Sequence, residues 1–311
     1  MQRTKTASSV KARPSHINDT RGDRIFGVVN GVFIALIAII TLYPMIYVVS
    51  ASFSSPGSVT SGRMWLWPVD PTLEGYARIM KNSDILNGYK NTIFYTLIQI
   101  AISLCTTLPA AYALTVKQLP MRRFFVILFS VTMFFSGGMI PLYVLNRNLG
   151  LVDTLWAVIL PSATSMWYII LSRTFFQSTI PHDLEEAAQI DGCSVFATFL
   201  RVVLPLSAPI IAVMALYFGV ARWNSYFGEM IFFRDRSKYP LQLYLREILI
   251  VAQFSEENTS NADAITMAEQ VRISAIIKFA TMIVATVPLI AVYPFIQRYF
   301  VKGVMIGSIK G

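Results

Sequence analysis

Six long apolar stretches constrain this chain more than any other feature of its sequence. Each holds about 20 or more mostly apolar residues, the length that an α-helix needs to cross the hydrocarbon core of a bilayer. They cover roughly residues 25–49, 92–116, 124–145, 156–176, 206–233 and 273–296. We therefore predict an all-α membrane protein whose domain of six transmembrane helices occupies residues 25–296.

The composition agrees with a membrane protein. Hydrophobic residues make up 55% of the chain and charged residues 14%, where soluble proteins carry about 25% charged residues. A disordered protein and an ordinary soluble enzyme are thereby excluded. The net charge of +9 is expected to mark cytoplasmic loops rather than a nucleic-acid site. Two cysteines and two histidines, far apart in the chain, predict neither a disulfide framework nor a metal site.

The distribution of positive charge predicts the orientation in the membrane. With the N-terminus inside, the inner segments hold 14 Lys and Arg residues and the longer outer loops hold 10, as the positive-inside rule requires. Both termini are then cytoplasmic: a basic, disordered tail of residues 1–24 and a second tail of residues 297–311. The first apolar stretch is longer than a signal-peptide core, so we expect an uncleaved helix.

The inner segment 181–205 has the pattern of two short helices that meet at a glycine. Pro181 and the acidic residues after it suit a helix start, and Gly192 suits its end. Ser194 is placed to cap a second helix, which Pro205 is expected to stop. Spacing alone leaves open whether this hairpin contacts a partner or packs on the ends of its own transmembrane helices. Acid–base catalysis by its adjacent glutamates is disfavoured, because neighbouring side chains on a helix point in different directions.

Several motifs together resemble one family. Glu186-Ala187-Ala188, Gly192 and Leu204-Pro205 follow the EAA…G…LP signature of the membrane subunits of ABC importers. Tyr89-Lys90-Asn91-Thr92 and Trp223-Asn224-Ser225 are similar to carbohydrate permeases that handle oligosaccharides and polysaccharide fragments. The glycine-rich ending of the chain resembles the smaller permease of maltose-type importers. The resemblance implies the transmembrane domain of a type I ABC importer.

The resemblance also implies roles and partners. The residues expected to couple to the ATPase are Glu185, Glu186, Ala187, Ala188, Asp191, Gly192, Leu204 and Pro205. The tail residues expected to reach the ATPase are Lys302, Gly303, Gly307, Lys310 and Gly311. The implied partners are a second permease subunit, two ATPase subunits and an extracytoplasmic solute-binding protein, in a bacterial cytoplasmic membrane. The chain lacks a phosphate-binding P-loop, so ATP and Mg²⁺ belong to partner subunits and the chain itself is not an enzyme.

Strongly polar residues inside apolar stretches are candidates for the solute path. They and two neighbouring aromatic residues are Gln99, Arg222, Trp223, Asn224, Tyr226 and Lys278. An alternative is that they anchor helices at the membrane interface, with Glu229 paired to Lys278. Arg246 and Glu247 are expected either to contact the binding protein or to order their loop. Gly137-Gly138 is expected to permit close helix packing, with a role in gating as the alternative.

The predicted cargo is an oligosaccharide or a related sugar solute. Aromatic faces beside hydrogen-bonding groups suit sugar rings, which have apolar faces and polar edges. An importer for a polyamine, an oxyanion or a peptide remains an alternative, as does a transporter driven by an ion gradient. The hairpin argues against the last alternative, because a gradient-driven transporter needs no docking element for an ATPase.

Overall fold

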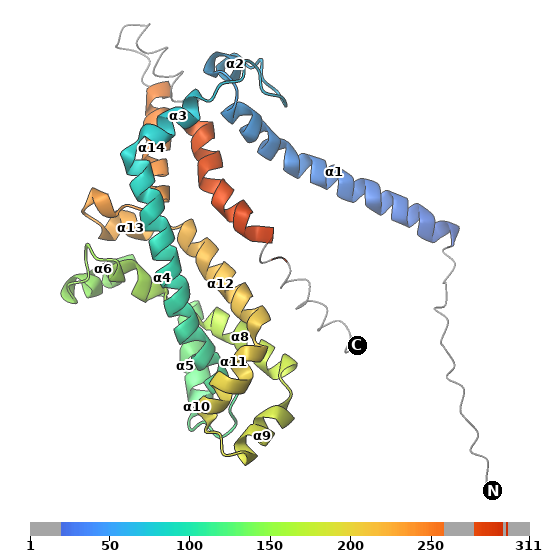
Figure 1. The fold of residues 1–311 in the computed structure, drawn as a ribbon, viewed down its shortest axis with the longest axis vertical. Coiled ribbons are helices and arrows are strands. Elements are labelled where there is room, and N and C mark those ends of the chain that lie inside the picture. Colours follow the sequence, from blue (N-terminus) through green and yellow to red (C-terminus); the bar gives the residue numbers. More distant parts are fainter. Residues whose placement is uncertain (1–19, 258–276, 295–296, 298–311) are drawn as a thin grey trace.

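A computed structural model describes residues 20–257, 277–294 and 297 of the chain. Within these residues every regular element is a helix, which agrees with the all-α prediction. Several helices pack along α4, Ser83–Ala113, which runs through the length of the bundle (Figure 1). The hairpin of α9, His182–Ile190, and α10, Val195–Thr198, lies at one end of this bundle. The short helices α2, Pro56–Thr60, and α3, Glu74–Lys81, lie at the other end.

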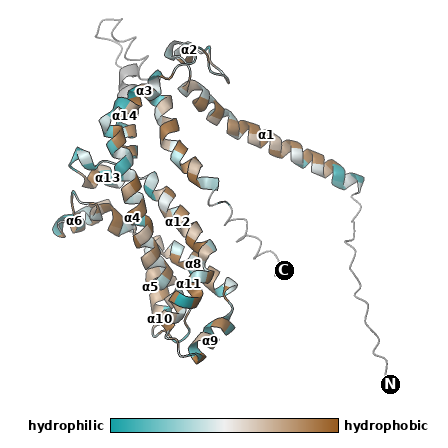
Figure 2. Cartoon of the chain, in the orientation of Figure 1, coloured by the Kyte–Doolittle hydropathy of each residue, from teal (hydrophilic) through white to brown (hydrophobic). Residues whose placement is uncertain are grey.

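Helix α1, Arg21–Ser52, is the first apolar stretch. Thr20 starts it through a capping box, in which Thr20 Oγ1 accepts from the Asp23 backbone and the Asp23 carboxylate accepts from the Thr20 backbone. No residue of its most apolar 18-residue window is buried, and Figures 1 and 2 show a mostly apolar helix standing apart from the bundle. It joins the rest of the chain at its far end, where Ser50 Oγ donates to the Leu66 carbonyl at 2.5 Å.

Helix α4, Ser83–Ala113, is the central helix of the bundle. It begins nine residues before the predicted stretch because Asn82 caps it, accepting from the Asp84 backbone N–H at 2.9 Å. Helices α8, Met166–Thr179, α12, Ala208–Trp223, and α14, Leu241–Glu257, pack against it. The core between α4, α8 and α12 includes Leu108, Phe176, Met214 and Phe218, each at most 4% exposed. The burial of these side chains holds the bundle together.

Three of the described helices are long and apolar enough to cross a membrane: α1, α4 and the unlabelled helix Ile277–Pro294. Two further apolar stretches form bent pairs. Helices α5, Arg122–Phe134, and α6, Met139–Asn148, meet at 114°, and the segment Val195–Leu206 meets α12 at 83°. The stretch 156–176 consists of α7, Trp156–Ile159, η1, Leu160–Ser162, and α8.

The break between α5 and α6 corrects one expectation. Gly137 and Gly138 were expected to allow close packing, but among the described residues nothing lies within 4 Å of a Cβ built at either position. Gly138 instead has φ +81°, a conformation that favours glycine. The glycine pair follows the end of α5, and Gly138 directly precedes α6, where the chain turns. Within the described residues the pair therefore serves a bend rather than a close contact.

The remaining described elements are short. They are α2, Pro56–Thr60, α3, Glu74–Lys81, α9, His182–Ile190, α10, Val195–Thr198, the π-helix η2, Phe199–Val203, α11, Leu204–Leu206, α13, Phe227–Phe232, and η3, Arg236–Lys238. The predicted stop at Pro205 is wrong, because the helical path continues through α11 and turns at Ser207. The π-helical turn before Pro205 removes the regular i→i−4 pattern that a proline would disrupt.

Candidate functional site

The hairpin has the predicted corner at Gly192. Helix α9 ends at Ile190, and Gly192 has φ +81°, as expected for a glycine that terminates a helix. The backbone N–H of Cys193 returns to the Ala188 carbonyl at 2.9 Å. Ser194 caps α10 as predicted, its Oγ accepting from the Ala197 backbone at 3.3 Å. Local sequence thus determines the shape of this corner.

The base of the hairpin is fixed to the bundle by aromatic contacts. Tyr112 of α4 stacks on Phe199 of η2, with ring centroids 5.2 Å apart, and meets Phe176 of α8 edge-on at 6.3 Å. Ala188 is also buried, at 6% exposure. The interpretation that the hairpin packs on its own bundle is therefore correct for its inner face.

The opposite face of the hairpin is open. The Glu186 side chain is 63% exposed, whereas that of Glu185 is 17% exposed. Ile190 and Phe196 are 86% and 66% exposed. Large apolar side chains that stand exposed outside the apolar helices commonly mark a protein interface. The hairpin therefore offers a surface with apolar side chains and an exposed carboxylate.

His182 lies between the two glutamates. Its Nδ1 is 3.9 Å from Glu185 Oε2, and its Nε2 is 3.7 Å from Glu186 Oε1. Burial raises the pKa of the Glu185 carboxyl, and the charge of His182 opposes that rise. These residues border a cavity of about 290 Å³ that Lys117 also lines.

Two predicted solute-path residues meet in a second pocket, of about 290 Å³. Gln99 of α4 and Arg222 of α12 both line it, with Ser165, Tyr168, Phe218 and Ser225 among the other lining residues. Gln99 and Arg222 are 123 positions apart in the sequence, so the fold alone brings them together. The loop after η1 and the start of α8 complete the wall.

Arg222 is paired in a way that sequence reasoning missed. Its Nη2 donates to Glu229 Oε1, and Ser225 Oγ donates to Glu229 Oε2 at 3.0 Å. Glu229 is fully buried. The expected pairing of Glu229 with Lys278 is therefore wrong. The chain turns after α12, and this turn brings α13 and Glu229 back to Arg222.

The other path candidates do not join this pocket's lining. Trp223 is 7% exposed, and its Nε1 donates to the Ala285 carbonyl at 3.0 Å. Asn224 donates to the Val220 carbonyl of its own helix at 2.9 Å. The Arg246 guanidinium lies 5.2 Å from the Tyr226 ring centroid. Lys278 is half-buried on helix Ile277–Pro294. The predicted tail residues Lys302, Gly303, Gly307, Lys310 and Gly311 lie outside the described residues, as do residues 1–19 of the N-terminal tail.

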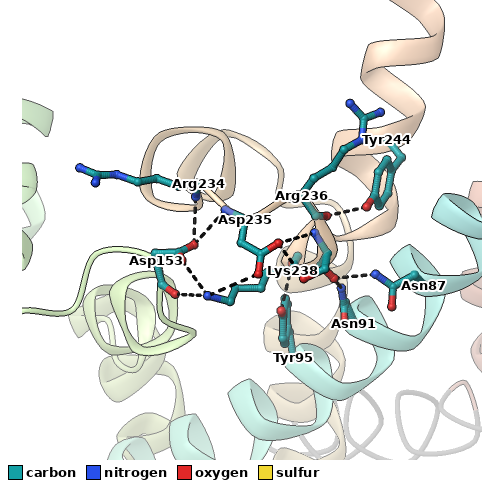
Figure 3. Close-up of polar contacts among 10 residues, drawn as sticks. Asn87, Asn91, Tyr95, Asp153, Arg234, Asp235, Arg236, Lys238 and Tyr244 are labelled. Atoms are coloured by element: carbon teal, nitrogen blue, oxygen red, sulfur yellow. Dashed lines mark hydrogen bonds and ion pairs between the residues drawn. The ribbon is translucent and has the colours of Figure 1, made fainter.

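A polar network beside the N-terminal half of α4 was not predicted. Asp153 accepts from the backbone N–H groups of Arg234 and Asp235 at 3.0 and 3.1 Å, and from Lys238 Nζ at 2.7 Å (Figure 3). These bonds hold the pKa of Asp153 at about 2, with the Lys238 hydrogen bond as the largest cause. We call residues 234–239 the outer strap.

Helix α4 holds the other side of the outer strap. Asn87 and Asn91 both donate to the Ser237 carbonyl, at 2.5 and 2.7 Å, and Tyr95 donates to the Lys238 carbonyl at 3.0 Å. Asn87, Asn91 and Tyr95 recur every four residues along one helix face. This spacing is the signal that sequence reasoning could have used, although it does not reveal the partner.

The described residues form a helical bundle with helices long enough to cross a membrane and a helical hairpin at one end, so the class of protein is a helical membrane protein. Comparison with known proteins specifies the family. A model of the family described as binding-protein-dependent transport system inner membrane component matches residues 19–306. The chain belongs to this family, and it is a permease subunit of an ABC importer.

Individual relatives match over almost the whole chain. The chain is 38% identical over 295 residues to Protein LplC of Bacillus subtilis (strain 168), covering 95% of this chain and 98% of LplC. It is 37% identical over 289 residues to the polygalacturonan/rhamnogalacturonan transport system permease protein YtcP of the same organism, covering 93% and 99%. Among solved structures, it matches a chain of a bacterial ABC transporter involved in the import of the acidic polysaccharide alginate. That match has a TM-score of 0.79 and 35% identity, covering 91% of this chain and 99% of the other.

Proposed function

We propose that this permease subunit moves an oligosaccharide or polysaccharide fragment across the membrane, and that the hairpin of residues 181–205 couples it to the ATPase. The names of YtcP and of the alginate importer support a saccharide cargo. The pocket between α4, α8 and α12 supports a solute path through this subunit. A panel of oligosaccharides tested for stimulation of ATPase activity in the assembled transporter would identify the cargo.

One observation carries the coupling role: the hairpin is packed against the bundle on one face and open on the other. On its inner face Tyr112 of α4 stacks on Phe199, so a displacement of the hairpin would act on α4. Its outer face presents Glu186, Ile190 and Phe196. ATP binding on a partner can bias the arrangement of the helices only through a contact that differs between the two states. The hairpin provides such a contact.

The proposal includes the partners and the orientation. The assembly comprises a second permease, two ATPases that bind ATP and Mg²⁺, and an extracytoplasmic binding protein. The hairpin and both termini are cytoplasmic. The chain itself performs no chemistry. Cytoplasmic placement of the hairpin is supported by the positive charge of the inner segments.

The test changes the hairpin and leaves the membrane helices intact. Glu186→Lys replaces attraction to a basic partner by repulsion, which costs several kcal/mol if the contact is desolvated. Gly192→Val forces a branched residue into a conformation with φ +81°, at a cost of about 1 kcal/mol or more. Both variants are expected at normal protein level, with weakened ATPase co-purification and lost uptake.

Two matched variants serve as controls for charge and for glycine replacement. Glu186→Gln removes the charge without adding repulsion and is expected to give an intermediate loss. Gly57→Val changes a glycine that has open space around it and no left-handed φ, and it is expected to retain ATPase binding. If Glu186→Lys and Gly192→Val both keep wild-type co-purification and uptake, the hairpin is only a structural cap.

A further inference from the structure

The pocket beside Gln99 and Arg222 carries a single kind of charge on its wall. Arg222 is the one ionised side chain among its described lining residues, and the others are polar, aromatic or small apolar residues. Glu229, the carboxylate that pairs with Arg222, is 0% exposed and does not line the pocket. A solute in the pocket can therefore contact the Arg222 guanidinium, whereas the Glu229 carboxylate that balances its charge is buried behind the pocket wall.

The hydrogen-bond assignments show which groups remain for a ligand. The Gln99 amide nitrogen donates to Ser103 Oγ at 2.8 Å and to the Ser162 carbonyl at 3.0 Å, while its oxygen accepts from Ser162 Oγ at 3.1 Å. Gln99 is thus occupied within the protein. The Arg222 guanidinium uses Nη2 for Glu229, and its Nε and Nη1 donate to no group among the described residues. Nη1 lies on the Cδ side of the planar guanidinium and the Nε hydrogen points to the other side, so these two nitrogens offer separate donors that point in different directions.

The Arg222 guanidinium is held in place by its other contacts. Glu229 fixes Nη2, and Ser225 fixes the second oxygen of that carboxylate. Arg222 itself is 8% exposed, so the charge is largely removed from solvent. A guanidinium held in this way keeps its charge at the pocket wall and has N–H donors left for a charge-assisted hydrogen bond to a carboxylate oxygen.

We propose that this pocket recognises an acidic sugar residue, a uronate, and that Arg222, positioned by Glu229, is the residue that selects its carboxylate. This inference rests on the proposed saccharide transport. Ser165 and Tyr168 supply hydroxyls for the polar edge of the sugar, and the Tyr168 and Phe218 rings, 4.7 Å apart and edge-on, supply an apolar wall. The volume of about 290 Å³ is at the small end of ligand pockets and suits one sugar residue of a longer chain.

Physical chemistry favours the acidic sugar over a neutral one. A carboxylate oxygen replaces the water lost from a free Arg222 N–H with a charge-assisted hydrogen bond, about twice as strong as a neutral one. A neutral sugar hydroxyl leaves part of that desolvation uncompensated. The described wall also lacks a carboxylate that would accept hydrogen bonds from sugar hydroxyls and repel an acidic sugar.

The test uses the assembled transporter in proteoliposomes with its ATPases and binding protein. The probes are α-1,4-linked trigalacturonate and the same trisaccharide with its carboxyl groups reduced. Arg222→Gln alone would leave Glu229 as an unpaired buried charge, so the main variant is Arg222→Gln with Glu229→Gln, which keeps an amide pair in place. Arg147→Gln makes the same change at an exposed arginine outside the pocket and serves as the control.

We expect the wild type and Arg147→Gln to prefer the acidic probe. We expect the double variant to transport the neutral probe and to lose that preference by about tenfold or more, the size of one charge-assisted hydrogen bond. The binding protein is identical in every experiment, so a change in the ratio of acidic to neutral transport rates is caused by the permease. An unchanged ratio in the double variant, or no acidic preference in the wild type, overturns the inference while saccharide transport stands. Failure of every oligosaccharide, these two included, to be transported overturns the proposed cargo as well.

Discussion

Gly88 is the position where the structure predicts the sharpest effect of adding one methyl group. A Cβ at Gly88 would lie 2.8 Å from Tyr244 Cδ2, 3.0 Å from Leu241 Cα and 3.1 Å from Leu241 N. Two of these atoms are backbone atoms of α14, so a side-chain rotation cannot relieve the overlap. The Leu241 N–H also donates to Thr92 Oγ1 at 2.8 Å, and separating α4 from α14 would stretch that bond.

The magnitude follows from two opposing terms. Overpacking a well-packed contact costs about 1–3 kcal/mol, whereas replacing glycine by alanine inside a helix gains about 1 kcal/mol. Gly88→Ala should therefore destabilise the protein by about 1 kcal/mol. With 311 residues and an unfolding entropy of about 2.1 cal/mol/K per residue, that corresponds to a fall in Tm of about 1.5 °C.

The assay is thermal unfolding of the purified transporter, with two matched glycine variants. At Gly219 the Cβ would meet Ile100 Cδ1 at 3.2 Å, the flexible end of a side chain, so we expect little change. At Gly31, on α1, nothing lies within 4 Å, so Gly31→Ala should leave Tm unchanged or raise it. If Gly88→Ala is as stable as Gly31→Ala, the close contact between α4 and α14 is wrong.

Three further predictions follow from burial, charge and orientation. Trp223→Ala should lower the Tm of the assembled transporter, because truncating a buried tryptophan costs about 3–5 kcal/mol. An unchanged Tm with lost transport would contradict this and favour a role for Trp223 in the solute path. Because the pKa of Asp153 falls to about 2 in the folded protein, its contact with Lys238 should contribute stability above about pH 4. The Tm difference between wild type and Asp153→Asn should then be constant from pH 7 to 5 and disappear as pH approaches 2; a difference already lost at pH 5 would contradict the assignment. In a chain without its native cysteines, an impermeant thiol reagent applied from outside should label Ser61→Cys and not Gln189→Cys, and the reverse pattern would invert the orientation.

Features that depend on local chemistry could be predicted from the sequence. Apolar stretches of about 20 residues have few alternatives to membrane helices, because backbone polar groups must be paired inside the bilayer. Gly192 and Ser194 shape the hairpin through their own backbone and side chain. These features need only neighbouring residues, so a linear pattern is sufficient to predict them.

Which distant groups meet depends on the tertiary structure. The sequence suggested Lys278 as the partner of Glu229, but the turn after α12 brings Glu229 to Arg222. Trp223 was predicted on the solute path from its polar neighbours, and the structure shows its indole bonded to the helix Ile277–Pro294 and lining a separate cavity of about 470 Å³. Gly137-Gly138 was expected to permit packing or to act in gating, and the structure shows a bend between α5 and α6 at this point. In each case the outcome depends on how elements far apart in the chain pack together. Buried charges and hydrogen-bonding groups need partners, and those partners come from distant parts of the sequence that a linear pattern does not reveal.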